Sequence, residues 1–346
     1  MNEPKQADIF AEKPKEGEPW DVAIVGSGPS ALTAAIYSVR GAASTLILGG
    51  TTWGGQLMLT TDVDNFPGFP ESIQGPELIE RMRAQAERFG SEFVMEDVSE
   101  VRLDNSPFEL SAGGKNYKAK AVIIATGSQT KWLGVEGEDR LRGKGVSSCA
   151  PCDAPFFKDK KVIVVGGGDA AMEEALVLTK YASEVTLAHR RDSFKASQAM
   201  QQRVMSSDKI KIVWDTEVVE MLGEQRLSKV RMKTTAGTEQ AGKIEGGEEH
   251  EGAVYWNMPA EGLFVAIGHN PATDIFKGKI ELDQKGYVVK KPQDEHGFMM
   301  STSIPGVFVA GDVHDYHYQQ AVTAAGFGCM AGMEALKYLD KESPSY

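Results

Sequence analysis

The strongest constraint on the fold is a glycine-rich turn that occurs twice in the sequence, about 140 residues apart. The first copy, residues 26–31, follows the apolar segment 21–25, and the second copy, residues 166–171, follows the apolar segment 161–165. Each copy has the pattern Gly-x-Gly-x-x-Ala and precedes a segment with helical periodicity. A strand, this turn and a helix, in that order, open a Rossmann βαβ unit. The repetition predicts an α/β protein in which one nucleotide-binding design is duplicated.

The chain length of 346 residues suits about two domains. We expect a discontinuous division, in which residues 20–127 and 260–346 form the first domain and residues 128–259 are inserted as the second. Residues 1–19 are polar and lack the apolar stretch of a secretory signal, so we expect a flexible N-terminal segment. The fold class that we predict is α/β, with two Rossmann-like dinucleotide-binding domains of three-layer ββα architecture.

Composition excludes several classes of function. The net charge of −12 argues against a nucleic-acid partner and against binding to an anionic membrane surface. No apolar run is long enough for a transmembrane helix, which needs about 18 residues. Three cysteines are too few for a secreted disulfide framework, so we expect a cytoplasmic protein.

The first turn has the features of a pyrophosphate site. Gly26 allows the tight turn, Gly28 lets a phosphate approach the backbone, and the start of the following helix favours negative charge. The acidic residue that often ends the second strand and binds the ribose is missing, because Gly49 and Gly50 follow Leu48. The backbone of Thr51 and Thr52 is therefore the candidate for ribose recognition.

The second turn is followed by basic residues. The strand after its helix ends at His189, Arg190 and Arg191, where an NAD site would have an acid. Arginines at this position suit the 2′-phosphate of NADPH through bidentate hydrogen bonds. The alternative is that they form the solvated end of a strand.

The sequence Cys149-Ala150-Pro151-Cys152 is the candidate reactive site. Two thiols at this spacing can close a small disulfide. The alternative, half of a zinc site, needs two further ligands, whereas the only other cysteine is Cys329 and no His-x-x-x-His pair stands nearby. Asp153 is either an acid/base for a leaving thiolate or the N-cap of a helix.

Two dinucleotide turns around a CxxC pair closely resemble the low-molecular-weight thioredoxin reductases, and the likeness covers nearly all of residues 20–340. The segments with this resemblance are GSGPSALTAAIY, GGQLMLTTDVDNFPGF, ATGSQ, SSCAPCD, GGGDAAMEEAL, HRRDSFKAS, AIGHNPAT and VFVAGDVHDYHYQQAVTAAGFGCMA.

The resemblance implies a role for individual residues. The FAD site would consist of Ser27, Gly28, Pro29 and Ser30 at the pyrophosphate, Gln56 and Asn65 near the flavin, Val98 near the adenine, Asp312 at the ribitol, and Gln319, Gln320 and Ala321 at the isoalloxazine. The NADPH site would consist of Gly168, Asp169, Ala170, Ala171, His189, Arg190, Arg191 and Lys195. Cys152 would face the flavin, Cys149 would attack the substrate disulfide, and Asp153 would be the acid/base.

The resemblance also implies an activity, thioredoxin-disulfide reduction by a homodimer without a metal. Electrons would pass from NADPH through FAD and the Cys149–Cys152 disulfide to thioredoxin, and the NADPH domain would rotate between the two half-reactions. One alternative is a related flavoenzyme with a different donor or acceptor, such as a small-molecule dithiol oxidase. Another is a nucleotide-binding sensor in which the CxxC pair is only structural.

The chain departs from the family pattern at some of these positions. Gln319 stands where the family usually has arginine, and Lys195 stands where it usually has an arginine after His-Arg-Arg, which keeps the charge but not the planar guanidinium. Ala170 replaces the usual serine or threonine of the second turn, and Ala154 replaces a common glycine after the CxxC pair. The changes at Gln319 and Lys195 are expected to affect the affinity for dinucleotides.

Overall fold

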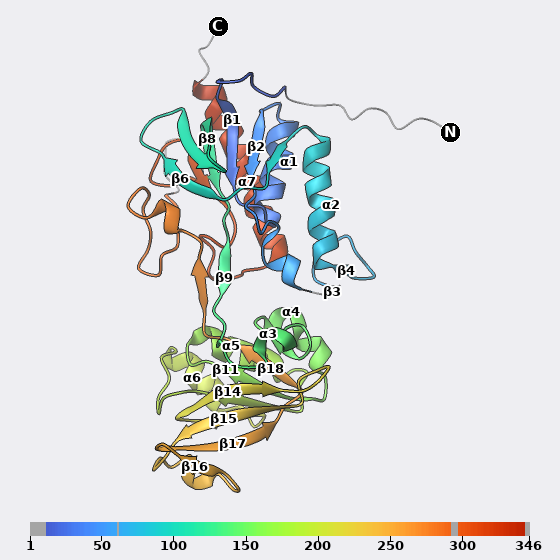
Figure 1. Cartoon of the computed structure of the whole chain (residues 1–346), viewed down its shortest axis with the longest axis vertical. Coiled ribbons are helices and arrows are strands. Elements are labelled where there is room, and N and C mark those ends of the chain that lie inside the picture. Colours follow the sequence, from blue (N-terminus) through green and yellow to red (C-terminus); the bar gives the residue numbers. More distant parts are fainter. Residues whose placement is uncertain (1–11, 61, 292–296, 343–346) are drawn as a thin grey trace, which may run out of the picture. The chain divides into compact units, whose positions relative to one another are not determined.

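The structure is a computed structural model that describes residues 12–60, 62–291 and 297–342 (Figure 1). The chain divides into two compact units: unit 1 is Met1–Gln129 with Asn270–Tyr346, and unit 2 is Thr130–His269. Residues 1–11 of the expected flexible N-terminal segment lie outside the described residues.

The centre of unit 1 is a parallel sheet with the strand order β5-β2-β1-β8-β20. Its strands are β1 (Trp20–Val25), β2 (Thr45–Leu48), β5 (Glu92–Val94), β8 (Lys115–Ile124) and β20 (Val307–Val309). The strand β2 and the last four residues of β8 are fully buried runs rich in β-branched side chains and leucine, as expected of strands that are buried on both faces. Because the strands are parallel, the loops that follow them meet at one edge of the sheet, where ligands bind in such folds.

Helices cover one face of this sheet, and a pair of antiparallel strands lies over the other face (Figure 1). The helices are α1 (Pro29–Arg40), α2 (Gly75–Arg88) and α7 (Ala321–Glu342). The strands β6 (Val98–Arg102) and β7 (Phe108–Ala112) pair in antiparallel fashion with each other and with β8. Smaller elements of the chain outside unit 2 are η1 (Gly55–Leu59), β3 (Asp62–Val63), β4 (Ile73–Gln74) and η4 (Asp274–Phe276).

Unit 2 repeats the arrangement. Its parallel sheet has the order β10-β18-β11-β12-β13, formed by β10 (Val146–Ser147), β18 (Gly262–Val265), β11 (Lys161–Val165), β12 (Glu184–Ala188) and β13 (Ile210–Val213). An antiparallel sheet, β14 (Thr216–Leu222), β15 (Lys229–Thr235), β17 (Ala253–Pro259) and β16 (Glu248–His250), covers one face. The helical elements are α3 (Glu138–Leu141), α4 (Ala150–Asp153), η2 (Ala154–Phe157), α5 (Asp169–Leu178), α6 (Gln198–Met205) and η3 (Ala241–Lys243).

Each unit therefore stacks helices, a parallel sheet and antiparallel strands, which confirms the predicted α/β class with three layers. The second crossing of the chain differs from the expected position between residues 259 and 260. It lies after His269, because β18 pairs with β10 and β11 and so belongs to the sheet of unit 2. The two chain crossings, β9 (Ser128–Thr130) and β19 (His269–Pro271), pair with each other.

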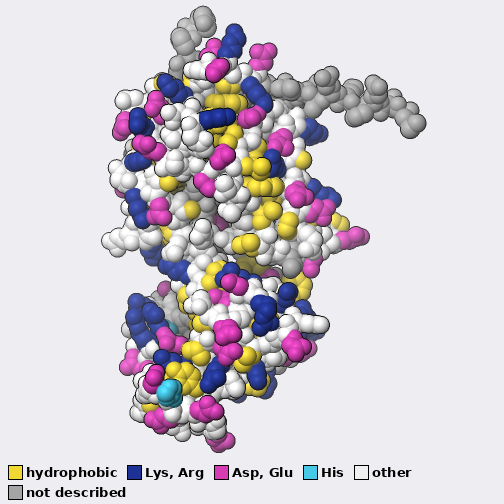
Figure 2. Space-filling model, viewed as in Figure 1, with side chains coloured by type: hydrophobic (Ala, Val, Ile, Leu, Met, Phe, Trp, Pro, Cys, Tyr) yellow, Lys and Arg dark blue, Asp and Glu magenta, His cyan; other side chains and the backbone are white. Residues whose placement is uncertain are grey.

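The surface carries charges of both signs. Figure 2 shows acidic and basic side chains interspersed over the visible face of the molecule. Across residues 12–60, 62–291 and 297–342, no helix combines the length and the apolar character that crossing a membrane requires.

Candidate functional site

The first glycine turn leaves open space at the start of α1. Gly26 has φ +123°, and a Cβ there would lie 2.2 Å from the carbonyl oxygen of Ala125, so only glycine fits. Gly28 is the N-cap of α1 and has no atom within 4 Å of the position of a Cβ. No side chain caps this helix start, so its first amide groups remain as donors for an anion. The turn fits a pyrophosphate.

The side chains of this turn hold the loop in place. The buried Ser27 hydroxyl donates a hydrogen bond to the Gly49 carbonyl at 2.6 Å and accepts one from the Gly54 amide at 2.9 Å. Pro29 occupies the first turn of α1, where a missing N–H costs nothing. Ser30 is buried against Gly311: a Cβ added to Gly311 would lie only 2.6 Å from the Oγ atom of Ser30. The loop after β20 is thereby brought to the start of α1.

A carboxylate that the sequence analysis missed stands at the end of β2. Asp97 accepts hydrogen bonds from the Thr51 amide at 3.2 Å and from the Thr51 hydroxyl at 2.6 Å. Val98, the predicted adenine contact, follows it at the start of β6, and Thr52 lies in the turn after Thr51. Asp97 thus brings a carboxylate from a distant segment to the loop that follows the second strand, which has no acid of its own.

Asp312 follows β20 at the same edge of the sheet. Its Oδ1 is buried and has no hydrogen-bond partner among the described residues. Burial, with a smaller contribution from the negative charge of Asp315, raises the pKa of Asp312 to about 7. A buried oxygen without a donor suits a ligand hydroxyl, such as those of the ribitol of FAD. The first unit therefore fits FAD.

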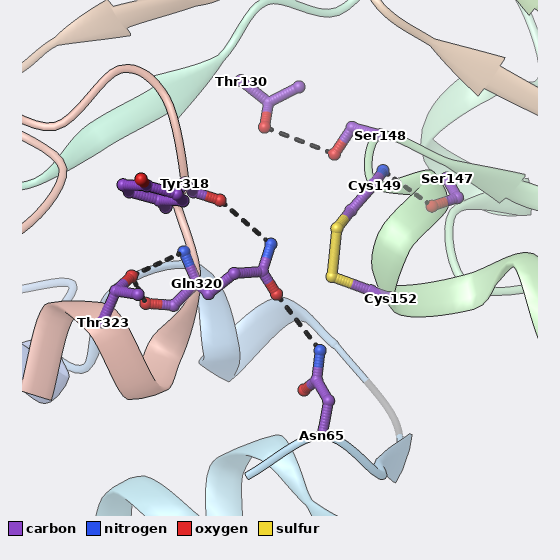
Figure 3. The surroundings of a disulfide bond; sticks show 9 residues. All are labelled: Asn65, Thr130, Ser147, Ser148, Cys149, Cys152, Tyr318, Gln320 and Thr323. Atoms are coloured by element: carbon purple, nitrogen blue, oxygen red, sulfur yellow. Dashed lines mark hydrogen bonds between the residues drawn. A yellow bond between two sulfur atoms is a disulfide. The ribbon is translucent and has the colours of Figure 1, made fainter. Parts of the chain in front are cut away.

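The residues predicted near the flavin form two hydrogen-bonded groups in unit 1. Asn65 Nδ2 donates to Gln320 Oε1 at 3.1 Å, as Figure 3 shows. Gln56 and Gln319 both donate to Ser128, the first to its carbonyl at 3.3 Å and the second to its hydroxyl at 3.2 Å. Ala321 is the first residue of α7. The structure thus brings these residues to the N-terminus of α7 and to the loops beside it.

The second glycine turn repeats the first in detail. A Cβ at Gly166 would lie 2.4 Å from the carbonyl oxygen of Ala266 and 2.6 Å from the Cβ of Ala171. Gly168 is the N-cap of α5, again with open space where a Cβ would stand and without a side-chain cap. Ala170 is exposed in the first turn of α5. Asp169 Oδ1 accepts hydrogen bonds from the amide and hydroxyl of Ser197, at 2.9 and 2.8 Å.

The basic loop after β12 is attached to this turn. The Lys195 amide donates to the Gly167 carbonyl at 2.8 Å. His189 is buried, and its Nε2 donates to the Ser193 carbonyl at 3.0 Å. Burial, reinforced by the charges of Arg191 and Arg190, lowers the pKa of His189.

The cations of this loop remain available for a ligand. The side chains of Arg190, Arg191 and Lys195 are exposed and form no ion pair within the described part of the chain. Three unpaired cations beside an open helix N-terminus fit a dinucleotide with an additional phosphate. The second unit therefore fits NADPH.

The CxxC pair is closed as a disulfide between Cys149 and Cys152, with 5.3 Å between the Cα atoms (Figure 3). Cys149 is the N-cap of the short helix α4, and Pro151 lies in its first turn. The Ser147 hydroxyl accepts a hydrogen bond from the Cys149 amide at 3.1 Å. Within the described ranges, no group of three or more His, Cys, Asp and Glu side chains gathers in a way that could hold a metal ion.

Asp153 closes α4 and precedes η2, for which it makes no capping hydrogen bond. Burial raises the pKa of Asp153, and a hydrogen bond with Ser147 opposes that rise. A carboxyl that retains its proton more readily beside a disulfide suits an acid/base better than a helix cap. Cys329, on α7, is partly buried and is not disulfide-bonded.

Comparison with known proteins agrees with this geometry. The model of the pyridine nucleotide-disulphide oxidoreductase family matches residues 20–328. The thioredoxin reductase of Streptomyces clavuligerus is 47% identical over 322 residues, which cover 92% of this chain and 94% of that protein.

Solved structures give the same result. The thioredoxin reductase from Giardia duodenalis has a TM-score of 0.84 and 38% identity, covering 93% of this chain and 99% of that one. The thioredoxin reductase from Streptococcus pyogenes MGAS5005 has a TM-score of 0.81 and 36% identity, covering 93% and 98%. These matches confirm the predicted pair of Rossmann-like dinucleotide-binding folds and the resemblance itself. The chain belongs to the pyridine nucleotide-disulphide oxidoreductases and, within them, to the thioredoxin reductase family.

Proposed function

We propose that this protein is an NADPH-dependent flavoenzyme that reduces the disulfide of thioredoxin through its own Cys149–Cys152 disulfide. The observation that carries the proposal is the closed disulfide of α4, in the same unit as a glycine turn with three unpaired cations beside it. The relatives named thioredoxin reductase support the same substrate. FAD, when bound in unit 1, supplies a group that accepts a hydride and passes on two electrons.

The residues of the chain would divide this work between binding and chemistry. We infer that Arg190, Arg191 and Lys195 bind the 2′-phosphate of NADPH, and that the amides at Gly168 bind its pyrophosphate. His189 would hold the loop against the turn. Asp169, Ala170 and Ala171 form the start of the helix over which the pyrophosphate would lie.

The FAD site is inferred in the same way. The turn at Ser27, Gly28, Pro29 and Ser30 would bind the pyrophosphate, and Asp312 a ribitol hydroxyl. Asp97, with the Thr51 and Thr52 backbone, would lie at the ribose, and Val98 beside the adenine. The residues that would orient the isoalloxazine are Gln56, Asn65, Gln319, Gln320 and Ala321.

In the chemistry, Cys152 would take the electrons from the flavin and Cys149 would attack the substrate disulfide as a thiolate. Asp153 would give its proton to the leaving thiolate. Because both the nicotinamide and the disulfide belong to unit 2 and must reach the same flavin, rotation of this unit between half-reactions is part of the proposal.

The test is NADPH oxidation that depends on added thioredoxin, compared between the wild type and Cys149→Ser. We expect the variant to lose at least about 1000-fold of thioredoxin reduction, because an alcohol is a far weaker nucleophile than a thiolate. NADPH should still bleach its flavin in anaerobic solution. An enzyme that passes no electrons to any thioredoxin of its own organism would contradict the proposal.

The same titration addresses the alternative of a different donor or acceptor. A flavin that NADPH fails to bleach would favour a dithiol oxidase or a reductase with another donor. The unpaired cations of unit 2 argue for NADPH.

We further propose that the protein is a cytoplasmic homodimer. On α7, Val322, Met330 and Met333 are exposed, and Tyr37 on the adjacent α1 is exposed as well. Apolar side chains that share one face of a helix pair suit a self-complementary interface. Light scattering of the wild type and of Met330→Glu/Met333→Glu tests this: a wild-type monomer would contradict the proposal.

A further inference from the structure

Behind the CxxC helix of unit 2 stands a second carboxyl, Glu174 of α5, with no role in the site described above. α5 packs against α4, and the Ala150 amide, in the first turn of α4, donates a hydrogen bond to the Glu174 carboxyl. The Oε2 atom of Glu174 is shielded from solvent and has no hydrogen-bond partner in the parts of the chain that the structure describes. One oxygen of this carboxyl is therefore used and the other is buried without a donor.

The surroundings of Glu174 favour its neutral form. Ala150, on the facing helix, and Ala175, next to it on α5, are both fully buried in the apolar cluster of unit 2. Burial raises the pKa of Glu174 to about 8; the Ala150 amide opposes this rise, and the negative charges of Asp153 and Glu173 add to it. These are the charged groups that act on Glu174 from α4 and from α5. Protonation removes the charge that this site cannot solvate.

Asp153 links this carboxyl to the disulfide. The Ser147 hydroxyl forms a hydrogen bond with Asp153 and also accepts a hydrogen bond from the Cys149 amide at 3.1 Å. The negative charge of Asp153, at the end of the redox helix, acts on Glu174, which stands behind that helix. A second negative charge in a poorly solvated site is unfavourable, so Glu174 holds its proton more readily while Asp153 is ionised.

We propose that Glu174 is a positioning residue that stores the solvent proton required for each disulfide reduction and supplies it through Asp153. This inference rests on the proposed function and adds a residue to it. A hydride from NADPH brings two electrons and one proton, whereas conversion of a disulfide to two thiols consumes two electrons and two protons. The second proton must come from solvent, and Glu174 is the group that holds it.

The exchange step then balances. Asp153 receives the proton of Glu174. The Cys149 thiolate attacks the substrate disulfide, the substrate S–S bond breaks, a mixed disulfide forms, and the leaving sulfur takes the bonding electron pair and this proton from Asp153. Glu174 is protonated again from solvent. The Cys152 thiol, which carries the proton that came with the hydride, next attacks the Cys149 sulfur. Its proton goes to the second substrate sulfur, which leaves as a thiol, and the Cys149–Cys152 disulfide is restored.

Infrared difference spectroscopy of the holoenzyme tests the stored proton without thioredoxin. We expect a protonated carboxyl carbonyl band at pH 7 that is absent from Glu174→Gln and that disappears in the wild type as the pH rises through about 8. In Asp153→Asn the band should persist and titrate at lower pH, because a negative neighbour has been removed. If the wild-type and Glu174→Gln spectra are identical at pH 7, the proposal is wrong, whatever the substrate of the enzyme.

The pH profile of thioredoxin reduction separates proton storage from a structural role. Glu174→Gln keeps an oxygen for the Ala150 amide, so we expect flavin reduction by NADPH to be unchanged. Thioredoxin turnover at pH 7 should fall by about tenfold, less than the roughly 100-fold contribution of a full general acid. The variant and the wild type should converge above pH 9, where Glu174 has lost its proton.

Glu217→Gln, which neutralises an exposed glutamate of β14 in the same unit, is the matched control and should follow the wild type throughout. A Glu174→Gln variant that is equally impaired at every pH would show a structural role and overturn the proposal.

Discussion

The two glycine turns have nearly the same backbone, but the groups at the end of the following strand have opposite charge. In unit 1, the end of β2 is met by the carboxylate of Asp97, which Thr51 holds through two hydrogen bonds. In unit 2, the end of β12 is followed by the exposed Arg190 and Arg191. An acid accepts hydrogen bonds from ribose hydroxyls, whereas arginines bind a phosphate. In the function that we propose, the turn selects a dinucleotide, and the end of the second strand selects which one.

The two units also differ in the part of the sequence that supplies the charged residue at the end of the second strand. The arginines of unit 2 follow their own strand, so the loop depends on local sequence and on its attachment to Gly167. Asp97 comes from the loop after β5, 46 residues from Thr51. The same position in the fold can thus be filled by a neighbour in sequence or by a distant segment.

The largest expected effect on cofactor binding comes from placing a side chain in each of the two glycine turns. Gly28 and Gly168 both have negative φ and open space for a side chain, so valine should leave the fold intact. We expect Gly28→Val to purify without flavin, and Gly168→Val to retain flavin but to lose at least about 100-fold in NADPH affinity, since the phosphate contacts of the helix start are blocked. Flavin absorbance and NADPH titration measure the two outcomes. Loss of flavin from both variants would break the assignment of one cofactor to each turn.

Removal of the cations of unit 2 should have a smaller, selective effect. Each charge-assisted hydrogen bond contributes about 1.5–3 kcal/mol, so Arg190→Ala or Arg191→Ala should raise the KM for NADPH by about 10–100-fold. The KM for NADH, which lacks the phosphate, should remain unchanged. Lys229→Ala, an exposed cation on β15, serves as the control. An equal loss with both nucleotides would mean that these arginines do not read the phosphate.

The smallest expected effect is a pH dependence of FAD binding to unit 1, caused by Asp312. The pKa of Asp312 is raised to about 7 without ligand, and a ribitol hydroxyl that donates to its carboxylate would favour the ionised form. FAD should therefore bind with full affinity above pH 7 and lose affinity as the pH falls through 7, by up to about tenfold per unit. Fluorescence titration of apoenzyme with FAD measures this. Asp312→Asn should abolish the dependence, and a dependence that survives this change would exclude Asp312 as its source.

Local patterns in the sequence predict much of this fold. The strand β11 has the predicted bounds, and β1 begins one residue before the predicted segment, because each is a short apolar run beside a turn. The glycines, the CxxC pair and the basic loop are likewise local, and the structure places each at a helix start or at a strand end. What a segment pairs with is not local. β18 looks like any buried strand, and only its pairing with β10 and β11 assigns it to unit 2.

The residues that sequence analysis missed are those with a chemistry set by burial. Glu174 belongs to a Glu-Glu pair on a helix, a pattern that is typical of a solvated face. Only the packing of α4 against α5 buries it. Asp97 is one acid among many in its segment, and its position depends on how β5 and β2 pair.

The pairing of β9 with β19 means that unit 2 begins and ends at the same place. A segment whose ends adjoin can be removed or exchanged as one cassette, because the host chain need only be rejoined across a short gap. The catalytic disulfide and its nucleotide turn are both inside this cassette. In evolution or in the laboratory, the disulfide and its glycine turn could therefore be replaced in a single recombination event while unit 1 is retained.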